Sequence, residues 1–343
     1  MATTSPVAAD PADLARSHGL LRFAVGTTAA FVLCEWRGWY PTFLAPLLAG
    51  VLLSSLPRAL PIKAGIGLVL IQAGAAIGTL MLSTLLRDMP FVLFGSIGLI
   101  LFLSFAAVAH GGPFLPILLL LLAMATVPIA TIMNPEQAGA LPQAFIRGMI
   151  VAVVMVWIVH AIWPRVPDAV PPEPKTSIVS PVAMAATGTL IVLPLMLVYL
   201  MYGLTDALPV LITTVVLVVN LDPKRSAMQG LAMMVGNFLG GMIAILAFEL
   251  IGIAPSLLSL ALVSFIIALL FAIRMDRGGP SATVGLITFN QTIVLLSLAL
   301  MPGPTSPGLW MTRLVQFGIA CLFAIGMMTL VMPRVMAKAR PAT

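Results

Sequence analysis

Long apolar runs separated by short polar breaks dominate the sequence. Twelve runs approach or reach the roughly 20 mostly apolar residues needed to cross a bilayer. The breaks carry Pro, Gly or charge, as in His110-Gly111-Gly112-Pro113. We therefore predict an all-α polytopic membrane protein with spans at 20–36, 41–57, 64–86, 90–109, 114–133, 144–163, 178–202, 207–221, 226–249, 255–273, 281–301 and 310–332. The second and eighth runs, 41–57 and 207–221, are short.

Composition excludes a soluble protein. Of 343 residues, 61% are hydrophobic and 8% charged, against roughly 25% charged residues in soluble domains. A soluble core of this size would still need a polar shell, so the mean hydropathy of +1.14 argues against a soluble enzyme. The 17 basic residues are scattered between apolar runs, which does not indicate nucleic-acid binding. Cys34 and Cys321 lie far apart and show neither disulfide nor zinc spacing.

Lys and Arg gather on one predicted side of the membrane. If the termini and the even-numbered loops share a side, thirteen basic residues lie there. The other side then holds Arg37, Arg87, Arg147 and Arg313. The positive-inside rule places both termini in the cytoplasm. Residues 1–17 lack the basic start of a signal peptide, so we expect a polar cytoplasmic tail.

The chain contains signs of an internal duplication. The Pro-rich segment 165–177 is the longest polar interruption and is typical of a semi-rigid linker. Gly26 matches Gly188 at an offset of 162, and the pair Gly74 and Gly78 matches Gly236 and Gly240. We predict two parallel six-helix repeats, related by an axis along the membrane normal. The predicted divisions are 1–17, 18–164, 165–177, 178–333 and a C-terminal tail at 334–343.

The two glycine pairs have a structural and a functional interpretation. Small residues four apart let neighbouring helices approach closely. We favour this packing role over substrate contact, and we expect both pairs to occupy equivalent, tightly packed positions.

Several of these features resemble the FUSC family of fusaric-acid-resistance and aromatic-acid exporters. Lys63 precedes a Gly-rich third span, and Arg147 begins a sixth span that closes on Pro164. The resemblance covers nearly the whole chain, although the large cytoplasmic domains of many relatives are replaced here by a short linker and tail. It implies export of small aromatic or other organic acids from a bacterial inner membrane, beside a periplasmic membrane-fusion adaptor.

Polar residues inside the predicted spans are candidates for substrate binding. Asn290 and Gln291 lie at the middle of the eleventh span and could donate to a substrate carboxylate. Interhelical hydrogen bonding is the alternative, since amides commonly join membrane helices. Gln72 and Asn237 invite the same two interpretations more weakly.

Arginine is the second group of candidates. Arg147 and Arg313 begin corresponding spans, and their planar forks suit a carboxylate; the alternative is snorkelling to headgroups. Arg22 and Lys63 could guide anions at the cytoplasmic entrance, although the positive-inside rule already accounts for them. Asp222 follows the eighth span as a gate latch or as part of a solvated charge cluster.

Proton coupling has only weak candidates. Glu35 and Glu249 lie at the ends of spans, and His160 lies near the end of the sixth span. A lone His there is also a common helix-end hydrogen-bonding residue. No acidic residue lies at the centre of a predicted span.

The function that best fits these patterns is secondary export of small organic, chiefly aromatic, acids. No phosphate-binding loop is found, so we expect no ATPase, no enzymatic activity and no cofactor or metal. An anion channel built on arginine rings and a non-transporting scaffold of an efflux assembly are the alternatives. We expect the lipid bilayer, an organic anion and the adaptor as partners, no nucleic acid, and leave a homo-oligomer open.

Overall fold

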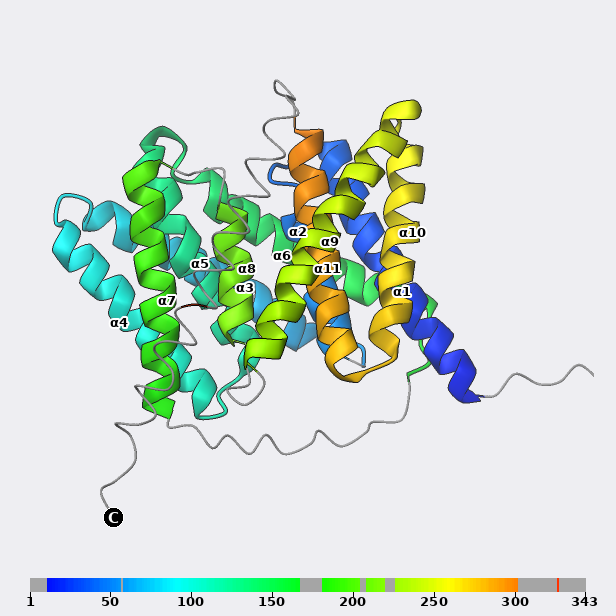
Figure 1. The fold of residues 1–343 in the computed structure, drawn as a ribbon, viewed down its shortest axis with the longest axis horizontal. Coiled ribbons are helices and arrows are strands. Elements are labelled where there is room, and N and C mark those ends of the chain that lie inside the picture. The colour runs from blue at the N-terminus through cyan, green and yellow to red at the C-terminus, as the bar shows by residue number, and fades with distance from the viewer. Residues whose placement is uncertain are drawn as a thin grey trace, which may run out of the picture.

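The computed structural model describes residues 11–56, 58–166, 181–203, 208–219, 226–301 and 326. In this part of the chain the elements are helices joined by short loops (Figure 1). They are α1 (Pro11–Arg37), α2 (Leu44–Ser55), α3 (Ile62–Leu85), α4 (Pro90–Ala109), α5 (Phe114–Met133), the 3-10 turn η1 (Pro135–Gln137), α6 (Ala140–Ile162), α7 (Pro181–Tyr202), α8 (Leu208–Val219), α9 (Ser226–Ile253), α10 (Leu257–Asp276) and α11 (Gly279–Leu300).

Each of the first eleven predicted apolar runs coincides with one α-helix. Within the described residues, seven helices are long and apolar enough to cross a membrane, which makes this a multi-pass membrane protein. The runs predicted to be short form α2 and α8, of 12 residues each, or about 18 Å, well below a core of about 30 Å. The twelfth predicted span lies outside the described residues apart from Gly326.

Local sequence signals place several helix ends. Pro90 occupies the first turn of α4, where its missing N–H costs nothing. Ser256 caps α10, its side chain accepting a hydrogen bond from the Ser259 N–H at 3.1 Å. Gly278 and Gly279 have φ of 70° and 63° in the turn between α10 and α11, a region that favours glycine.

The two halves of the chain interlock in this fold. Helix α1 packs against α10 of the second half, and α4 of the first half packs against α7 (Figure 1). Within the halves, α3 packs against α5 and α9 packs against α11. Helix α2 contacts α11, and α8 contacts α5. Contacts between helices of the first and second halves therefore hold the two halves together in one bundle.

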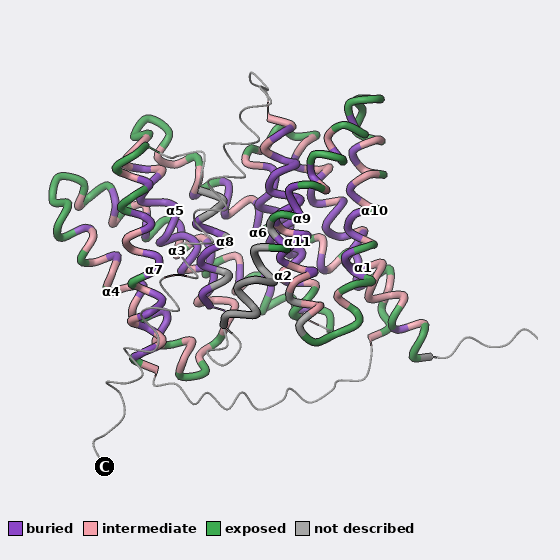
Figure 2. Tube along the Cα trace, in the orientation of Figure 1, coloured by how far each residue is buried: buried purple, intermediate pink, exposed green. Residues whose placement is uncertain are grey.

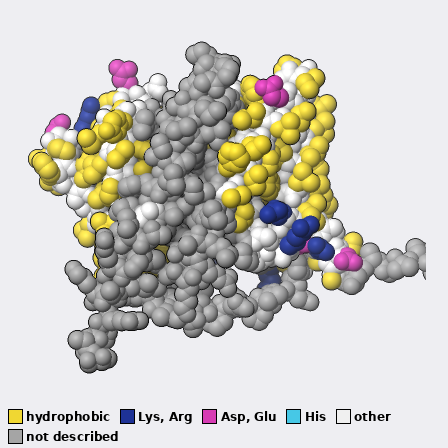
Figure 3. Space-filling model, in the orientation of Figure 1, with side chains coloured by type: hydrophobic (Ala, Val, Ile, Leu, Met, Phe, Trp, Pro, Cys, Tyr) yellow, Lys and Arg dark blue, Asp and Glu magenta, His cyan; other side chains and the backbone are white. Residues whose placement is uncertain are grey.

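The buried core runs through the centre of this bundle, while apolar side chains also cover its outside. Figure 2 shows buried segments on α5, α2 and α6, with exposed stretches on α4. The largest buried side chains include Phe31, Phe105, Phe145 and Phe289. Phe91 of α4 is 93% exposed, and Figure 3 shows apolar atoms over much of the visible outer face. Such a surface is expected where lipid replaces water as the solvent.

The glycine pairs differ in their surroundings, contrary to expectation. A Cβ on Gly236 would lie 2.9 Å from Thr288 Oγ1, so α9 and α11 approach closely there. Gly74 and Gly78 are exposed, and a Cβ on either would meet no atom of the described residues within 4 Å. The packing prediction is confirmed for the second pair and wrong for the first, and the two pairs are not equivalent. The pair on α3 lies on the helix face that points away from the bundle.

Candidate functional site

A cavity of about 480 Å³ opens at one end of the bundle. We call this the linker end, because Trp163 to Val166 lie there, just before the predicted linker. The opposite end, where α1 finishes, is called the Arg37 end. The cavity is lined by the beginnings of α1, α5 and α11 and by the ends of α2 and α10. Its volume lies within the 300–1,000 Å³ typical of small-molecule sites.

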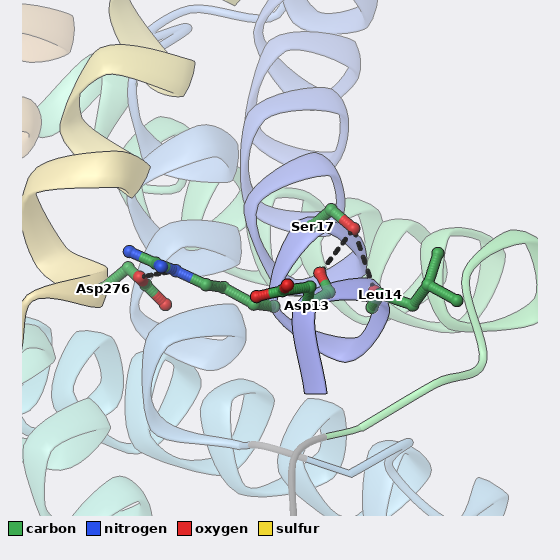
Figure 4. Close-up of polar contacts among 5 residues, drawn as sticks. Asp13, Leu14, Ser17 and Asp276 are labelled. Carbon is green, nitrogen blue, oxygen red and sulfur yellow. Dashed lines mark hydrogen bonds and ion pairs between the residues drawn. The ribbon is translucent and has the colours of Figure 1, made fainter. Parts of the chain in front are cut away.

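Charged groups surround the mouth of this cavity. Arg16 of α1 forms an ion pair with Asp276 of α10 (Figure 4). Ser17, beside it, donates back to Asp13 O at 2.9 Å within α1. Ser54 and Ser55 of α2 add two hydroxyls to the lining. This opening therefore combines one ion pair with several hydrogen-bonding groups.

Arg22 also lines the cavity, and it holds the end of α6. Its Nη1 donates to Trp163 O at 2.8 Å and to Arg165 O at 2.7 Å. These carbonyls follow the last turn of α6, where unpaired oxygens carry partial negative charge. Arg22 is only 5% exposed. The entry role predicted for Arg22 fits its place in the lining, but its described bonds are structural.

Asn290 lines the cavity from α11. It is partly buried, and its Oδ1 has no hydrogen-bond partner among the described residues. This oxygen lies 3.7 Å from where a Cβ on Gly50 would stand, so the side chain faces α2. The Phe23 ring also lines the cavity and packs edge-on against Phe289 at a centroid distance of 5.0 Å. The cavity lining thus includes the Asn290 side chain and an aromatic wall.

At the Arg37 end, a chain of short hydrogen bonds ties α1 to α11. Thr42 donates to Glu35 Oε1 at 2.5 Å. The hydroxyls of Thr42 and Ser297 lie 2.6 Å apart. Thr42 and Ser297 are both fully buried. These contacts close the bundle between the end of α1 and the end of α11.

Beside this closure, one tryptophan lies between two arginines. The guanidinium carbon of Arg37 is 5.4 Å from the Trp39 ring centroid, and that of Arg147 is 5.7 Å away. Both distances fall within the range of cation–π attraction. Arg147 forms no ion pair with a described residue, and its buried Nε has no acceptor. Arg147 therefore keeps hydrogen-bonding capacity for an anion.

The other predicted binding residues do not meet Asn290 in this cavity. Gln291 is 1% exposed and faces α9, where a Cβ on Gly240 would lie 2.9 Å from Gln291 Cβ. Gln72 is fully buried on α3, and its side-chain nitrogen and oxygen have no hydrogen-bond partner in the part of the chain that the structure describes. Lys63 is exposed at the start of α3. Asn237 lies on α9 with its side chain outside the described part, and Arg313 and Asp222 lie outside the described residues.

The three candidates for proton coupling lie apart. His160 is buried near the end of α6, and its Nδ1 lies 2.8 Å from Val156 O. That contact fits the helix-end interpretation of this histidine. Glu35 lies at the Arg37 end in contact with Thr42, and Glu249 is exposed on α9. The structure therefore does not join these groups into one relay. Among the described residues, no three His, Cys, Asp or Glu gather as metal ligands would.

Sequence reasoning missed the residues that shape both ends of the bundle. Arg16 counted only as one of the thirteen basic residues on the predicted cytoplasmic side. Trp39 was not among the predicted site residues. Ser297 could have been found, because it lies seven residues after Asn290 and so on the same face of one helix. The pairing of Thr42 with Ser297 had no signal, since 255 residues separate them.

Comparison with known proteins gives one match. A family described as "Protein of unknown function (DUF2955)" matches residues 19–159, from α1 nearly to the end of α6. No curated protein and no solved structure matches the chain. The chain is thus similar over its first six helices to a family whose function is not described.

Proposed function

We propose that the protein is a secondary exporter of small organic acids, chiefly aromatic ones, in a bacterial inner membrane. The observation that carries this proposal is the cavity at the linker end, with Arg16 and Arg22 in its lining, an aromatic wall and the Asn290 side chain. A carboxylate competes with Asp276 for Arg16, and the ring of an aromatic acid packs against Phe23. The FUSC resemblance of the sequence points to the same substrate class.

The depth of Asn290 supports its role in binding. It lies 11 residues beyond the start of α11, or about 16 Å along the helix. Half of a bilayer core is about 15 Å, so Asn290 reaches the membrane centre. Transporter sites commonly lie at this depth. The proposed topology puts the linker end, and hence the entrance, in the cytoplasm.

The closed Arg37 end supports a carrier over a channel. The cavity ends within the bundle, and the bonds from Glu35 through Thr42 to Ser297 lie beyond it. A carrier with a gated site opens to one side at a time, and this arrangement fits the inward-open state. Arg147 then receives the anion when the Arg37 end opens.

Two six-helix repeats remain part of the proposal. If each helix corresponds to the one six places later, the contact of α1 with α10 corresponds to that of α7 with α4. The contacts of α3 with α5 and of α2 with α11 then correspond to those of α9 with α11 and of α8 with α5. Reciprocal packing of this kind supports a pseudo-twofold axis.

Counterflow in proteoliposomes tests this function. Purified full-length protein is reconstituted, and uptake of labelled benzoate is measured with and without unlabelled benzoate inside, with acetate as the non-aromatic comparison. Acceleration by internal benzoate is expected for an exporter. A conductance without exchange would indicate the anion channel. The absence of both exchange and conductance would favour the efflux scaffold. Co-purification with a periplasmic adaptor tests the partnership that the resemblance implies.

A further inference from the structure

A second, mainly apolar groove lies between α9 and α10, on the outside of the bundle. It has a volume of about 550 Å³. Its walls are two stripes with helical spacing, Ile243, Leu246, Ala247 and Leu250 on α9 and Val263, Ile266, Ile267 and Leu270 on α10. Leu246 is 61% exposed and Leu270 is 62% exposed. The groove therefore faces the hydrocarbon of the bilayer and not the bundle interior.

The charge in this groove is confined to one end. The stripe on α10 continues through Ile273 to Arg274 and Arg277, which also line the groove. These arginines are three residues apart and share one helix face. They lie at the linker end of α10, and Figure 3 shows basic atoms gathered below the apolar face.

Neither arginine is neutralised by an acid in the described part of the chain. Arg274 and Arg277 are exposed and form no ion pair with a described residue. The acid between them, Asp276, is engaged by Arg16 of α1 (Figure 4). The groove thus presents two available guanidinium groups at the end of an apolar channel.

We propose that this groove is a binding site for one anionic phospholipid, with an acyl chain between α9 and α10 and its phosphate on Arg274 and Arg277. Arginine forks match phosphate oxygens bidentately. Basic pockets between membrane helices on the cytoplasmic side bind such headgroups. The site is separate from the export cavity and does not depend on the proposed substrate.

Native mass spectrometry of the full-length protein in detergent tests this site. Delipidated protein is titrated with phosphatidylglycerol and, separately, with phosphatidylcholine of the same chain length. We expect one phosphatidylglycerol to bind, with a roughly 25-fold preference over phosphatidylcholine. Each arginine near a membrane surface contributes about 1 kcal/mol, or about fivefold in affinity. Arg274→Gln with Arg277→Gln should therefore weaken phosphatidylglycerol binding roughly 25-fold and leave phosphatidylcholine unchanged.

The matched control is Arg58→Gln with Arg165→Gln, which removes the same charge from exposed positions outside the groove. This control should keep the wild-type preference. Equal binding of both lipids by the wild-type protein would overturn the proposal, and that measurement needs no variant to fold. Equal losses in the control and groove variants would also overturn it, as would a dimer whose interface excludes the lipid.

Discussion

Gly240 of α9 lies directly against Gln291 of α11. A Cβ on Gly240 would stand 2.9 Å from Gln291 Cβ and 2.8 Å from Thr288 O, closer than side chains normally approach. Because one of these neighbours is backbone, it cannot move aside cheaply. The absence of a side chain at this position therefore sets the spacing of the two helices.

Gly240→Leu should consequently destabilise the protein, whereas Gly78→Leu should not. Overpacking a tight contact costs about 1–3 kcal/mol or more, while a Cβ at residue 78 would have no described atom within 4 Å. Thermal unfolding in detergent, monitored by size-exclusion chromatography, measures the difference in stability between the two variants. Equal stability of the two leucine variants would contradict this packing.

The matching of these glycines by sequence shows where prediction failed. The buried residues Gln72 and Ala76 of α3 correspond in pattern to Gly236 and Gly240 of α9, at an offset of 164. The sequence comparison used 162, and two residues turn an α-helix by about 200°. It therefore paired an outer face with an inner one. The glycines were matched because they are identical residues, whereas the structure matches positions that are buried alike.

Helix positions, in contrast, followed from the sequence because hydrocarbon imposes apolar runs and breaks directly. The candidate site was only partly predictable. Asn290 and Gln291 are neighbours in sequence, and successive residues on a helix point about 100° apart. Asn290 consequently lines the cavity and Gln291 packs against Gly240. Which neighbour faces the cavity depends on α2 and α9, whose placement the sequence does not fix.

Arg147 should contribute to carboxylate transport through its planar guanidinium group as well as through its charge. Arg147→Gln removes both charge and fork, and a charge-assisted hydrogen bond contributes about 1.5–3 kcal/mol. The half-saturating benzoate concentration should rise roughly ten- to a hundredfold in proteoliposomes. Arg147→Lys should rescue only partly, because lysine lacks the planar fork. Arg87→Gln, exposed elsewhere, should have no effect, and full rescue by lysine would instead favour headgroup snorkelling.

Breaking the bond between Thr42 and Ser297 should open the Arg37 end. Cys34 is 4% exposed and lies next to Glu35, so its labelling by a maleimide reports on this closure. With Cys321→Ser as background, Thr42→Val or Ser297→Ala should speed labelling several-fold, because each removes a hydroxyl from the pair. Ser54→Ala, at the linker end, is the control. Unchanged rates in both variants would show that these hydroxyls do not hold the end closed.

Substitutions at Asn290 distinguish a role in substrate binding from a role in helix association. Because its Oδ1 accepts no hydrogen bond from a described residue, Asn290→Leu should leave thermal stability nearly unchanged while raising the half-saturating benzoate concentration. Asn290→Asp places a negative charge in the cavity, so repulsion should weaken benzoate uptake further, at least tenfold. Ser55→Ala lines the same cavity, but its hydroxyl bonds to Val51 O of its own helix at 2.6 Å, so it should transport normally. If Asn290 instead joins helices, Asn290→Leu will lower the unfolding temperature and leave the half-saturating concentration at the wild-type value.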